Sequence, residues 1–141
     1  DPDDLADKTI QGIDANSNGI RDDVELAIFK EYPNSAKTRA VLLQYALALQ
    51  MEVTQTIVNA GTVGAIEEQK SRGYLCVGKI VARDDMTRYI ETTSQLRSFV
   101  ETKQFNTEFR IRAQEEFYKN LESGEIPNKE LCDIDPNTLL N

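Results

Sequence analysis

The apolar residues between Ala36 and about Ala60 have helical spacing, and this feature limits the possible folds most strongly. One stripe recurs at steps of three and four residues, and it consists of Leu42, Ala46, Leu49, Val53 and Ile57. Three more apolar positions widen this stripe: Leu43, Leu47 and Met51. We therefore expect a long central helix with much of its circumference buried, around which the rest of the chain packs.

Other segments have similar spacing, and none shows the alternation of apolar and polar residues that is typical of a strand. We expect a helix over Asp23–Tyr32 and three more after the central one. The residues predicted to begin helices are Asn34 or Ser35, Asp84 or Asp85, and Asn106, and a turn is predicted at residues 61–64. The pattern predicts an all-α fold, a bundle of four or five helices with a loop before it.

The length of 141 residues suits a single domain. We expect a loop with its exit helix over residues 1–32, a helical core over 35–123 and a tail over 124–141. The residues expected to face the core are Val24, Ile28 and Phe29 in the exit helix, and Phe109, Ala113, Phe117 and Leu121 in the last helix. Gly73 and Gly78 lie within a predicted helix, where each costs about 1 kcal/mol unless it permits close packing.

Charge and composition argue against several functions. The net charge of −8 repels nucleic acid phosphates, so we expect no nucleic acid partner. No apolar run approaches the roughly eighteen residues of a membrane span, so we expect no span. The chain has no histidine, which removes the commonest general base and most zinc and iron sites.

Two features favour a secreted or periplasmic location. The chain opens at Asp1 without an initiator methionine, as expected once a signal peptide has been removed. It has two cysteines, Cys76 and Cys132, and an even count in a secreted protein indicates one disulfide that ties the tail to the body. Such a bridge would stabilise the fold by roughly 4 kcal/mol. The alternative is two unrelated buried thiols.

The segment from Asp14 to Glu25 carries oxygen ligands at the spacing of a calcium loop, and it reads D-A-N-S-N-G-I-R-D-D-V-E. Calcium takes roughly six to eight oxygen ligands. The predicted ligands are the side chains of Asp14, Asn16, Asn18, Asp22 and Glu25, together with the backbone carbonyl of Ile20. Gly19 stands at the sixth position, where the loop must bend sharply. We therefore predict one bound Ca²⁺.

This run resembles the EF-hand calcium loop, and it matches the pattern D-x-[DN]-x-[DN]-G-x5-E without a gap. Two departures stand out. The eighth position, a branched apolar residue in the EF-hand, is Arg21 here, and the segment before the loop is too short and polar for an entering helix. In both respects the loop is similar to the single calcium loops of bacterial secreted proteins, such as dockerin and thrombospondin type 3 repeats. The resemblance implies a structural ion and not a paired, calmodulin-like switch.

Part of the motif also has an interpretation without a metal. Clusters of Asn, Asp, Ser and Gly form ordinary turns, and Asp22 followed by Glu25 is close to a capping box. A turn and a cap explain the second half of the motif. They do not explain the alternation of Asp14, Asn16 and Asn18.

The leading functional hypothesis is a secreted or periplasmic helical protein in which one structural Ca²⁺ orders the N-terminal segment. We expect an affinity on the order of 10⁻⁵–10⁻³ M, because the loop is single and has few carboxylates. The alternative is a cell-envelope module that binds a protein or glycan and holds calcium incidentally. Its candidate partner-facing surface consists of five arginines: Arg83, Arg88, Arg97, Arg110 and Arg112. Acidic residues interleave with these arginines, and such a mixture is also typical of a solvated helix face.

A weaker alternative is a carboxylate-based hydrolase. Its best candidate is Glu52, an acidic residue within the apolar central helix. The simpler interpretation of Glu52 is an exposed residue that shares the narrow polar side of this helix with Gln55. No catalytic constellation is recognisable, so we do not expect an enzyme.

Overall fold

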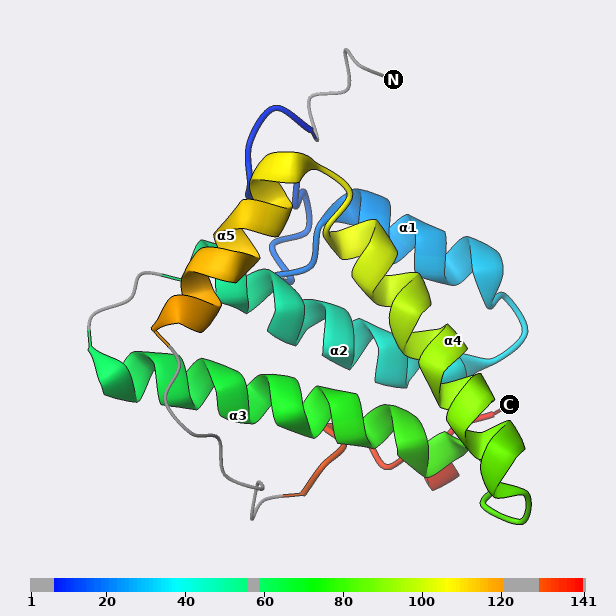
Figure 1. Cartoon of the computed structure of the whole chain (residues 1–141). Helices are drawn as coiled ribbons and strands as arrows, with labels where there is room; N and C mark the ends of the chain where they lie inside the picture. Colours follow the sequence, from blue (N-terminus) through cyan, green and yellow to red (C-terminus); the bar gives the residue numbers. More distant parts are fainter. Residues whose placement is uncertain (1–6, 56–58, 121–129, 141) are drawn as a thin grey trace.

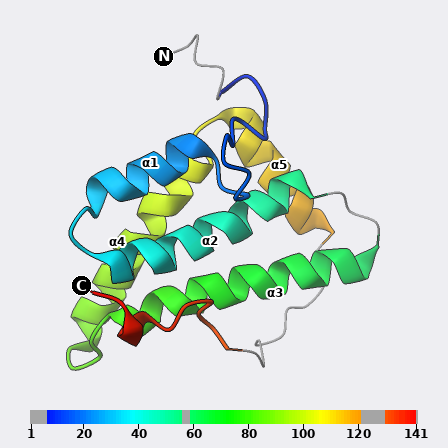
Figure 2. The same cartoon turned by 180° about the vertical axis from the view of Figure 1, so that it is seen from behind.

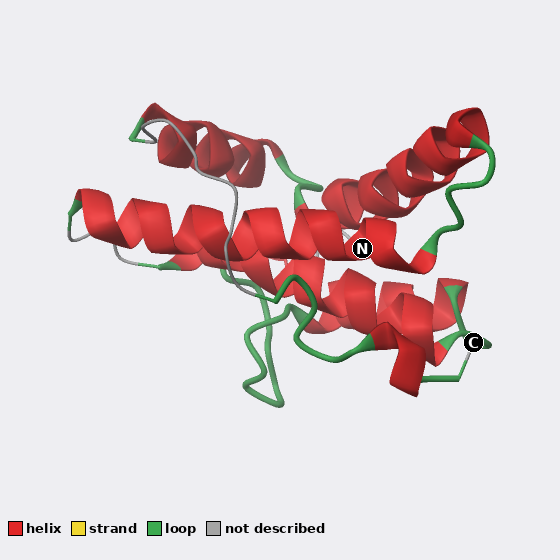
Figure 3. Ribbon diagram, turned by 90° about the horizontal axis from the view of Figure 1, so that it is seen from below, coloured by secondary structure: helices red, strands yellow, loops and turns green. Residues whose placement is uncertain are grey.

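The computed structural model describes residues 7–55, 59–120 and 130–140, and these ranges contain helices, turns and loops but no strand (Figure 3). Their α-helices are α1 (Asp22–Glu31), α2 (Ala36–Thr54), α3 (Ala60–Val77), α4 (Met86–Gln104) and α5 (Glu108–Lys119). Two short 3₁₀-helices, η2 (Gly78–Ile80) and η3 (Pro136–Thr138), follow α3 and lie in the tail. The prediction of an all-α bundle is confirmed. None of the helices in these ranges combines the length and the apolarity needed to cross a bilayer.

Helix α2 is the central element of the bundle, as the sequence predicts. It runs alongside α3, and it also contacts α1, α4 and α5 (Figures 1 and 2). Its fully buried residues come from the predicted stripe and its flanks, and they include Val41, Leu42, Tyr45, Ala46 and Leu49. The helix ends at Thr54 and not near Ala60, while Ile57 lies outside the described residues.

Two helix starts agree with the prediction. The side chain of Ser35 accepts a hydrogen bond from the N–H of Thr38, and this cap begins α2. In the same way Asp85 accepts from the N–H of Arg88 and begins α4. Short polar side chains next to apolar runs therefore locate these helix starts correctly.

Two other predicted helix starts are wrong. Residues 61–64 do not form a turn between helices, because they lie in the first turns of α3. The side chain of Asn59 caps this helix, and so α3 begins before the glycines. Helix α5 is capped by Thr107 and not by Asn106, whose side chain has partners elsewhere. Leu121, predicted on the buried face of α5, lies outside the described residues.

Gly73 allows α2 and α3 to approach each other closely. A Cβ atom at this position would lie 3.1 Å from the Cα of Tyr45 on α2. A Cβ at Gly78 would clash with the hydroxyl of Tyr89 on α4. Only Gly73 lies inside α3, where its packing role would offset its cost, because Gly78 is the C-cap of α3 and begins η2.

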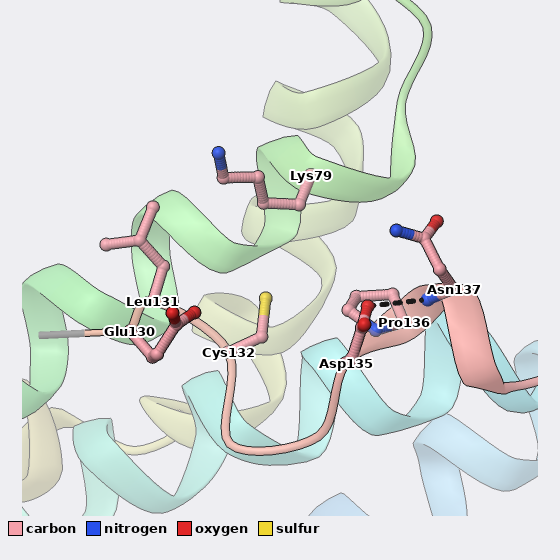
Figure 4. Close-up of a pocket in the computed structure, with 7 residues that line it drawn as sticks. All are labelled: Lys79, Glu130, Leu131, Cys132, Asp135, Pro136 and Asn137. Carbon is pink, nitrogen blue, oxygen red and sulfur yellow. Dashed lines mark hydrogen bonds between the residues drawn. The ribbon is translucent and has the colours of Figure 1, made fainter.

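The tail is fixed to the bundle by a disulfide between Cys76 of α3 and Cys132, so the predicted bridge is confirmed. Gln44 of α2 adds two hydrogen bonds, since its Nε2 donates to the carbonyl of Leu131 (2.7 Å) and its Oε1 accepts from the N–H of Asp133 (2.8 Å). Figure 2 shows the tail passing across α3. A pocket beside the bridge is lined by Lys79, Glu130, Leu131, Cys132, Asp135, Pro136 and Asn137 (Figure 4).

Candidate functional site

The first half of the predicted calcium loop is closed by the carboxylate of Asp14. This carboxylate accepts hydrogen bonds from the N–H groups of Asn18 (3.2 Å) and Gly19 (2.8 Å). The bend requires left-handed backbone angles, with φ of +85° at Gly19 and 55° at Ser17. Glycine is therefore required at the sixth position for the reason that the motif implies.

Three of the predicted ligands meet at one place in the structure. The two amides reach the same carboxylate, because Nδ2 of Asn18 donates to Oε1 of Glu25 (2.9 Å) and Nδ2 of Asn16 donates to Oε2 (3.3 Å). Glu25 lies on α1, so its side chain reaches back over the loop as the last position of a calcium loop does. The loop is thereby closed between its third, fifth and twelfth positions.

The capping-box interpretation is wrong. Arg21 is the N-cap residue of α1, and no side chain caps this helix. The N–H of Asp22 donates to the carbonyl of Ile13 (2.8 Å) and not to Glu25, which a capping box would require. The carboxylate of Asp22 accepts from the N–H of Ala15 at 3.1 and 3.2 Å. Both carboxylates therefore bind the loop and do not cap the helix.

The arrangement could hold a cation only after the two amides turn. Glu25 now receives two amide N–H groups, which supply the partial positive charge that Ca²⁺ would supply in full. A half-turn of each terminal amide exchanges nitrogen for oxygen, at the cost of the hydrogen bonds that the two amide oxygens accept from the N–H groups of Asn18 (3.4 Å) and Ile20 (2.9 Å). The amide oxygens of Asn16 and Asn18 would then face a carboxylate, which is stable only with a cation between them. No group of three His, Cys, Asp or Glu side chains within the described ranges could hold a metal. A cation in this loop would therefore need amide and carbonyl oxygens beside the carboxylates.

The residues at the seventh and eighth positions attach the loop to the bundle. The side chain of Ile20 is buried in the main core. Arg21 is fully buried, and its guanidinium makes a bidentate ion pair with Asp23, with both N–O distances 2.8 Å. Burial alone would raise the pKa of Asp23, but the hydrogen bond and charge of Arg21, with a contribution from Arg110, hold it below its ordinary value.

A groove lies against the loop on the outer side of α1. It is lined by three predicted ligands and by apolar side chains: Ala15, Asn16, Asp22, Glu25, Leu26 and Phe29. Leu26 is 69% exposed and Phe29 is 45% exposed. Val24, Ile28 and Phe29 were all predicted to face the core. Val24 and Ile28 are fully buried as predicted, whereas the prediction for Phe29 is wrong.

Glu52 is not on an exposed polar side of the central helix, so the simpler interpretation of this residue is wrong. It is only 3% exposed, whereas Gln55 is exposed. The reason is that α3 and α5 cover the helix end on which Glu52 lies, so this end has little free polar side. The hydroxyl of Tyr118 on α5 donates to Oε1 of Glu52 (3.4 Å), while Oε2 has no hydrogen-bond partner.

Burial raises the pKa of Glu52 to about 7, and the charge of Glu67 adds to the shift while Lys70 opposes it. Burial also raises the pKa of Glu67, whose Oε2 is likewise buried without a partner. Lys70 donates a hydrogen bond to the hydroxyl of Tyr118. These four side chains form the carboxylate cluster, which joins α2, α3 and α5.

The predicted arginine surface is divided in the structure. Arg110 is fully buried on the inner side of α5, so it faces no external partner. Arg97 lies 3.7 Å from the ring centroid of Tyr74 and donates to the Tyr74 carbonyl. Arg112 is exposed and pairs with Glu108 one helical turn away. The buried Arg110 therefore cannot share a partner-facing surface with the other four.

Sequence reasoning missed two features of the structure, the buried state of Arg110 and the carboxylate cluster. The sequence hint that Arg110 is buried was its position near the start of a helix, one turn after Asn106. Its acceptors at Asp7, Thr9 and Ile10 lie about 100 positions earlier in the chain, so the sequence alone does not reveal them. Comparison of the chain with family models, with curated proteins and with solved structures finds no match.

Proposed function

We propose that this protein is a calcium-binding helical module of the cell envelope or of the secreted fraction, in which one structural Ca²⁺ orders the N-terminal segment. The observation that carries the proposal is the convergence of Asn16 and Asn18 on the carboxylate of Glu25. Asp14 holds the same loop closed from its other end. The ligands would be the side chains of Asp14, Asn16, Asn18, Asp22 and Glu25 and the carbonyl of Ile20.

The ion would act on the loop by neutralising charge. Asp14, Asp22 and Glu25 are three of the four carboxylates in these twelve residues, and two neutral amides offset them only in part. The fourth, Asp23, is paired with Arg21. A divalent cation would remove that repulsion and tie the start of the loop to α1. The disulfide between Cys76 and Cys132 supports the proposed location, since such bridges persist mainly in oxidising compartments.

Isothermal calorimetry on chelator-treated protein tests the proposal. We expect calcium to bind with a Kd on the order of 10⁻⁵–10⁻³ M and to raise the melting temperature at millimolar concentrations. Magnesium should bind less well, because it demands octahedral geometry and gives up its waters reluctantly. Absence of both binding heat and a melting shift with millimolar calcium would refute the proposal.

A pair of matched variants locates the site. Glu25→Gln removes one carboxylate from the loop, and it should weaken calcium binding by more than about tenfold. Glu31→Gln removes an exposed carboxylate at the other end of α1, and it should bind calcium as the unmodified protein does. Equal affinities of the two variants would place the ion outside the loop.

A second candidate function is recognition of an envelope protein or glycan beside the loop. The groove with Leu26 and Phe29 favours it, because both side chains are exposed next to three predicted ligands. Pull-down from envelope extracts with the unmodified protein and with Leu26→Ser would test this function. Capture that does not change with the substitution would count against the groove.

A further inference from the structure

Arg21 connects the predicted calcium loop to the end of α4. Its Nη1 donates to the carbonyl of Gln104 (2.8 Å) and its Nη2 donates to the carbonyl of Lys103 (2.9 Å). These carbonyls lie at the C-terminus of α4, where no further helical turn supplies a donor. The eighth position, which packs against a second loop in paired EF-hands, is here used to bind another part of the same chain.

Arg110 connects α5 to the segment that precedes the loop. Its Nη1 donates to the carboxylate of Asp7 (2.8 Å), its Nη2 to the carbonyl of Thr9 (2.9 Å) and its Nε to the carbonyl of Ile10 (3.2 Å). The side chain is fully buried. Residues 7–10 therefore serve as the acceptors that allow this cation to be buried inside the protein.

Asn106 joins the two arginines. It lies in the short connection between α4 and α5, and its Oδ1 accepts from Nη1 of Arg110 (2.7 Å) and, at the limit of a hydrogen bond, from Nη2 of Arg21 (3.5 Å). Its Nδ2 donates to Asp7 (3.4 Å). The start of α1, the end of α4 and the start of α5 meet at this point, at the top of Figure 1. We call these side chains, with Asp7 and Asp23, the arginine corner.

The arginine corner makes the loop and α5 depend on each other. A buried guanidinium is stable only while its acceptors are in place, because removal from water costs several kcal/mol per ion. Outside α5 and its preceding turn, the acceptors of Arg110 include Asp7, Thr9 and Ile10, all in the segment before the loop. If the N-terminal segment detaches, Arg110 must be rehydrated, and the start of α5 must move to allow it.

The rest of α5 is attached by the contacts of Tyr118 with Glu52 and Lys70 and by a small apolar cluster. It consists of Val63 and Ile66 of α3 and Phe117 of α5, with Met51 and Tyr118 packed against them. The main core, by contrast, is built from α1, α2, α3 and α4. Helix α5 therefore depends on the arginine corner more than the other helices do.

We propose that calcium occupancy of the loop controls how firmly α5 is docked on the bundle. This inference rests on the proposed calcium site. Without the ion, only hydrogen bonds oppose the repulsion among Asp14, Asp22 and Glu25, so the loop opens more often and holds the adjoining residues 7–10 and Arg21 less firmly. With the ion, the loop is closed and both arginines keep their partners. By linkage, docking of α5 raises calcium affinity by the same factor.

Hydrogen exchange followed by mass spectrometry tests this coupling on the full chain with its disulfide intact. We expect calcium to slow exchange of the α5 amides (residues 108–119) by about tenfold relative to chelator-treated protein. Exchange of the α3 amides next to Cys76 should not change, because the disulfide and the main core hold them. If calorimetry detects calcium binding but α5 exchanges equally fast in both states, the coupling is refuted and the calcium site stands. If no calcium binds, both proposals fail.

Asn106→Ala separates the coupling from the binding. This variant keeps every predicted calcium ligand but removes the acceptor that Arg21 and Arg110 share. We expect weaker calcium binding and a smaller change in α5 exchange, both by a similar factor. The control is Arg112→Gln, which alters an exposed ion pair on the same helix and should respond to calcium as the unmodified protein does. Equal calcium-dependent changes in α5 exchange in the two variants would refute the coupling. If Asn106→Ala does not fold, the α5 exchange of the unmodified protein with and without calcium tests the coupling instead.

Discussion

Helix α5 is held by buried polar groups at both of its ends, and the two groups differ in sign and in completeness. At the N-terminal end, the arginine corner contains cations whose acceptors are backbone carbonyls, carboxylates and an amide. At the C-terminal end, the carboxylate cluster contains Glu52 and Glu67, each with one buried oxygen that has no partner. The first group therefore tightens the fold, and the second is a source of strain that depends on protonation.

The difference arises from the geometry of the donors and acceptors. A guanidinium has five N–H groups in a fork, and carbonyls at a helix end or in an extended segment match it easily. A buried carboxylate needs donors, and helices offer few of these along their sides because the backbone N–H groups are already used. The polar donors beside Glu52 include Lys70, Tyr118 and Gln114, and Lys70 also donates to Tyr118.

Arg21→Ala is the strongest way to break the arginine corner. We expect it to lower the free energy of unfolding by about 3–5 kcal/mol, because it leaves Asp23 and two carbonyls of α4 without their donor. Chemical denaturation at a fixed calcium concentration measures the loss. Arg112→Ala, on the exposed side of α5, should change stability by less than about 0.5 kcal/mol. Similar losses in both variants would show that the buried contacts of Arg21 contribute little.

Glu52→Gln tests the carboxylate cluster. Burial raises the pKa of Glu52 from its ordinary 4.5 to about 7, so the folded protein keeps a proton that the unfolded chain releases. The contribution of this group to stability is therefore most favourable below the unfolded pKa, falls as the pH rises and is least favourable above about pH 7. The shift corresponds to roughly 3 kcal/mol, an upper value for the penalty.

The variant should remove this pH dependence. Denaturation at about pH 8 should show Glu52→Gln to be more stable than the unmodified protein by up to roughly 3 kcal/mol, and at about pH 4 by far less. Glu115→Gln, an exposed position on α5, serves as the control and should follow the unmodified protein. A Glu52→Gln protein that loses stability at high pH would mean that the charge of Glu52 is needed in the fold.

Two glycines extend the comparison to the backbone. Gly19 in the loop has φ of +85°, and a Cβ there would lie 2.6 Å from Cδ1 of Leu47, so Gly19→Ala should destabilise the protein by about 1–2 kcal/mol. Gly64 lies in α3 near the carboxylate cluster, with no atom close to the position of a Cβ. Gly64→Ala should therefore stabilise by roughly 0.5–1 kcal/mol. Thermal melts of both variants check the opposite signs, and a neutral Gly19→Ala would contradict the loop geometry.

The local features of this fold could be predicted from the sequence. Ser35 and Asp85 cap helices as expected, because a cap depends only on residues within one turn. The position of the central helix was also predictable, since its apolar spacing is strong. The start of α3 was not, because Gly61 and Gly64 are typical of turns, and the cap at Asn59 outweighs that preference.

The long-range contacts could not be predicted in the same way. The sequence shows Arg21 as a departure from the EF-hand pattern, but its partners at Lys103 and Gln104 are more than eighty positions away. Asn106 has the residue type of a cap, and only the packing of α4 against α1 shows that it binds arginines. Glu52 was placed on the wrong face because the side of α2 that α5 covers cannot be read from α2 alone.

Tyr118→Phe is the finest test of the carboxylate cluster, and its expected effect is the smallest. The hydroxyl donates to Oε1 of Glu52, and this hydrogen bond lowers the pKa of that carboxyl against the larger effect of burial. Its loss should therefore move the midpoint of the pH dependence of stability to a higher pH, at a cost of about 1 kcal/mol where Glu52 is ionised. Unfolding free energies across the pH range measure both quantities.

The control for this substitution is Tyr89→Phe, which removes a hydroxyl that accepts from Arg83 far from the cluster. It should leave the midpoint unchanged. A midpoint that falls in Tyr118→Phe would mean that the hydroxyl mainly accepts from Lys70 and holds that charge away from Glu52. In that case Lys70 moves toward the carboxylate of Glu52 when the hydroxyl is lost. The cluster would then contain enough donors to stabilise the ionised form of Glu52. The contrast between the two ends of α5 would then come from how the donors are shared and not from how many there are.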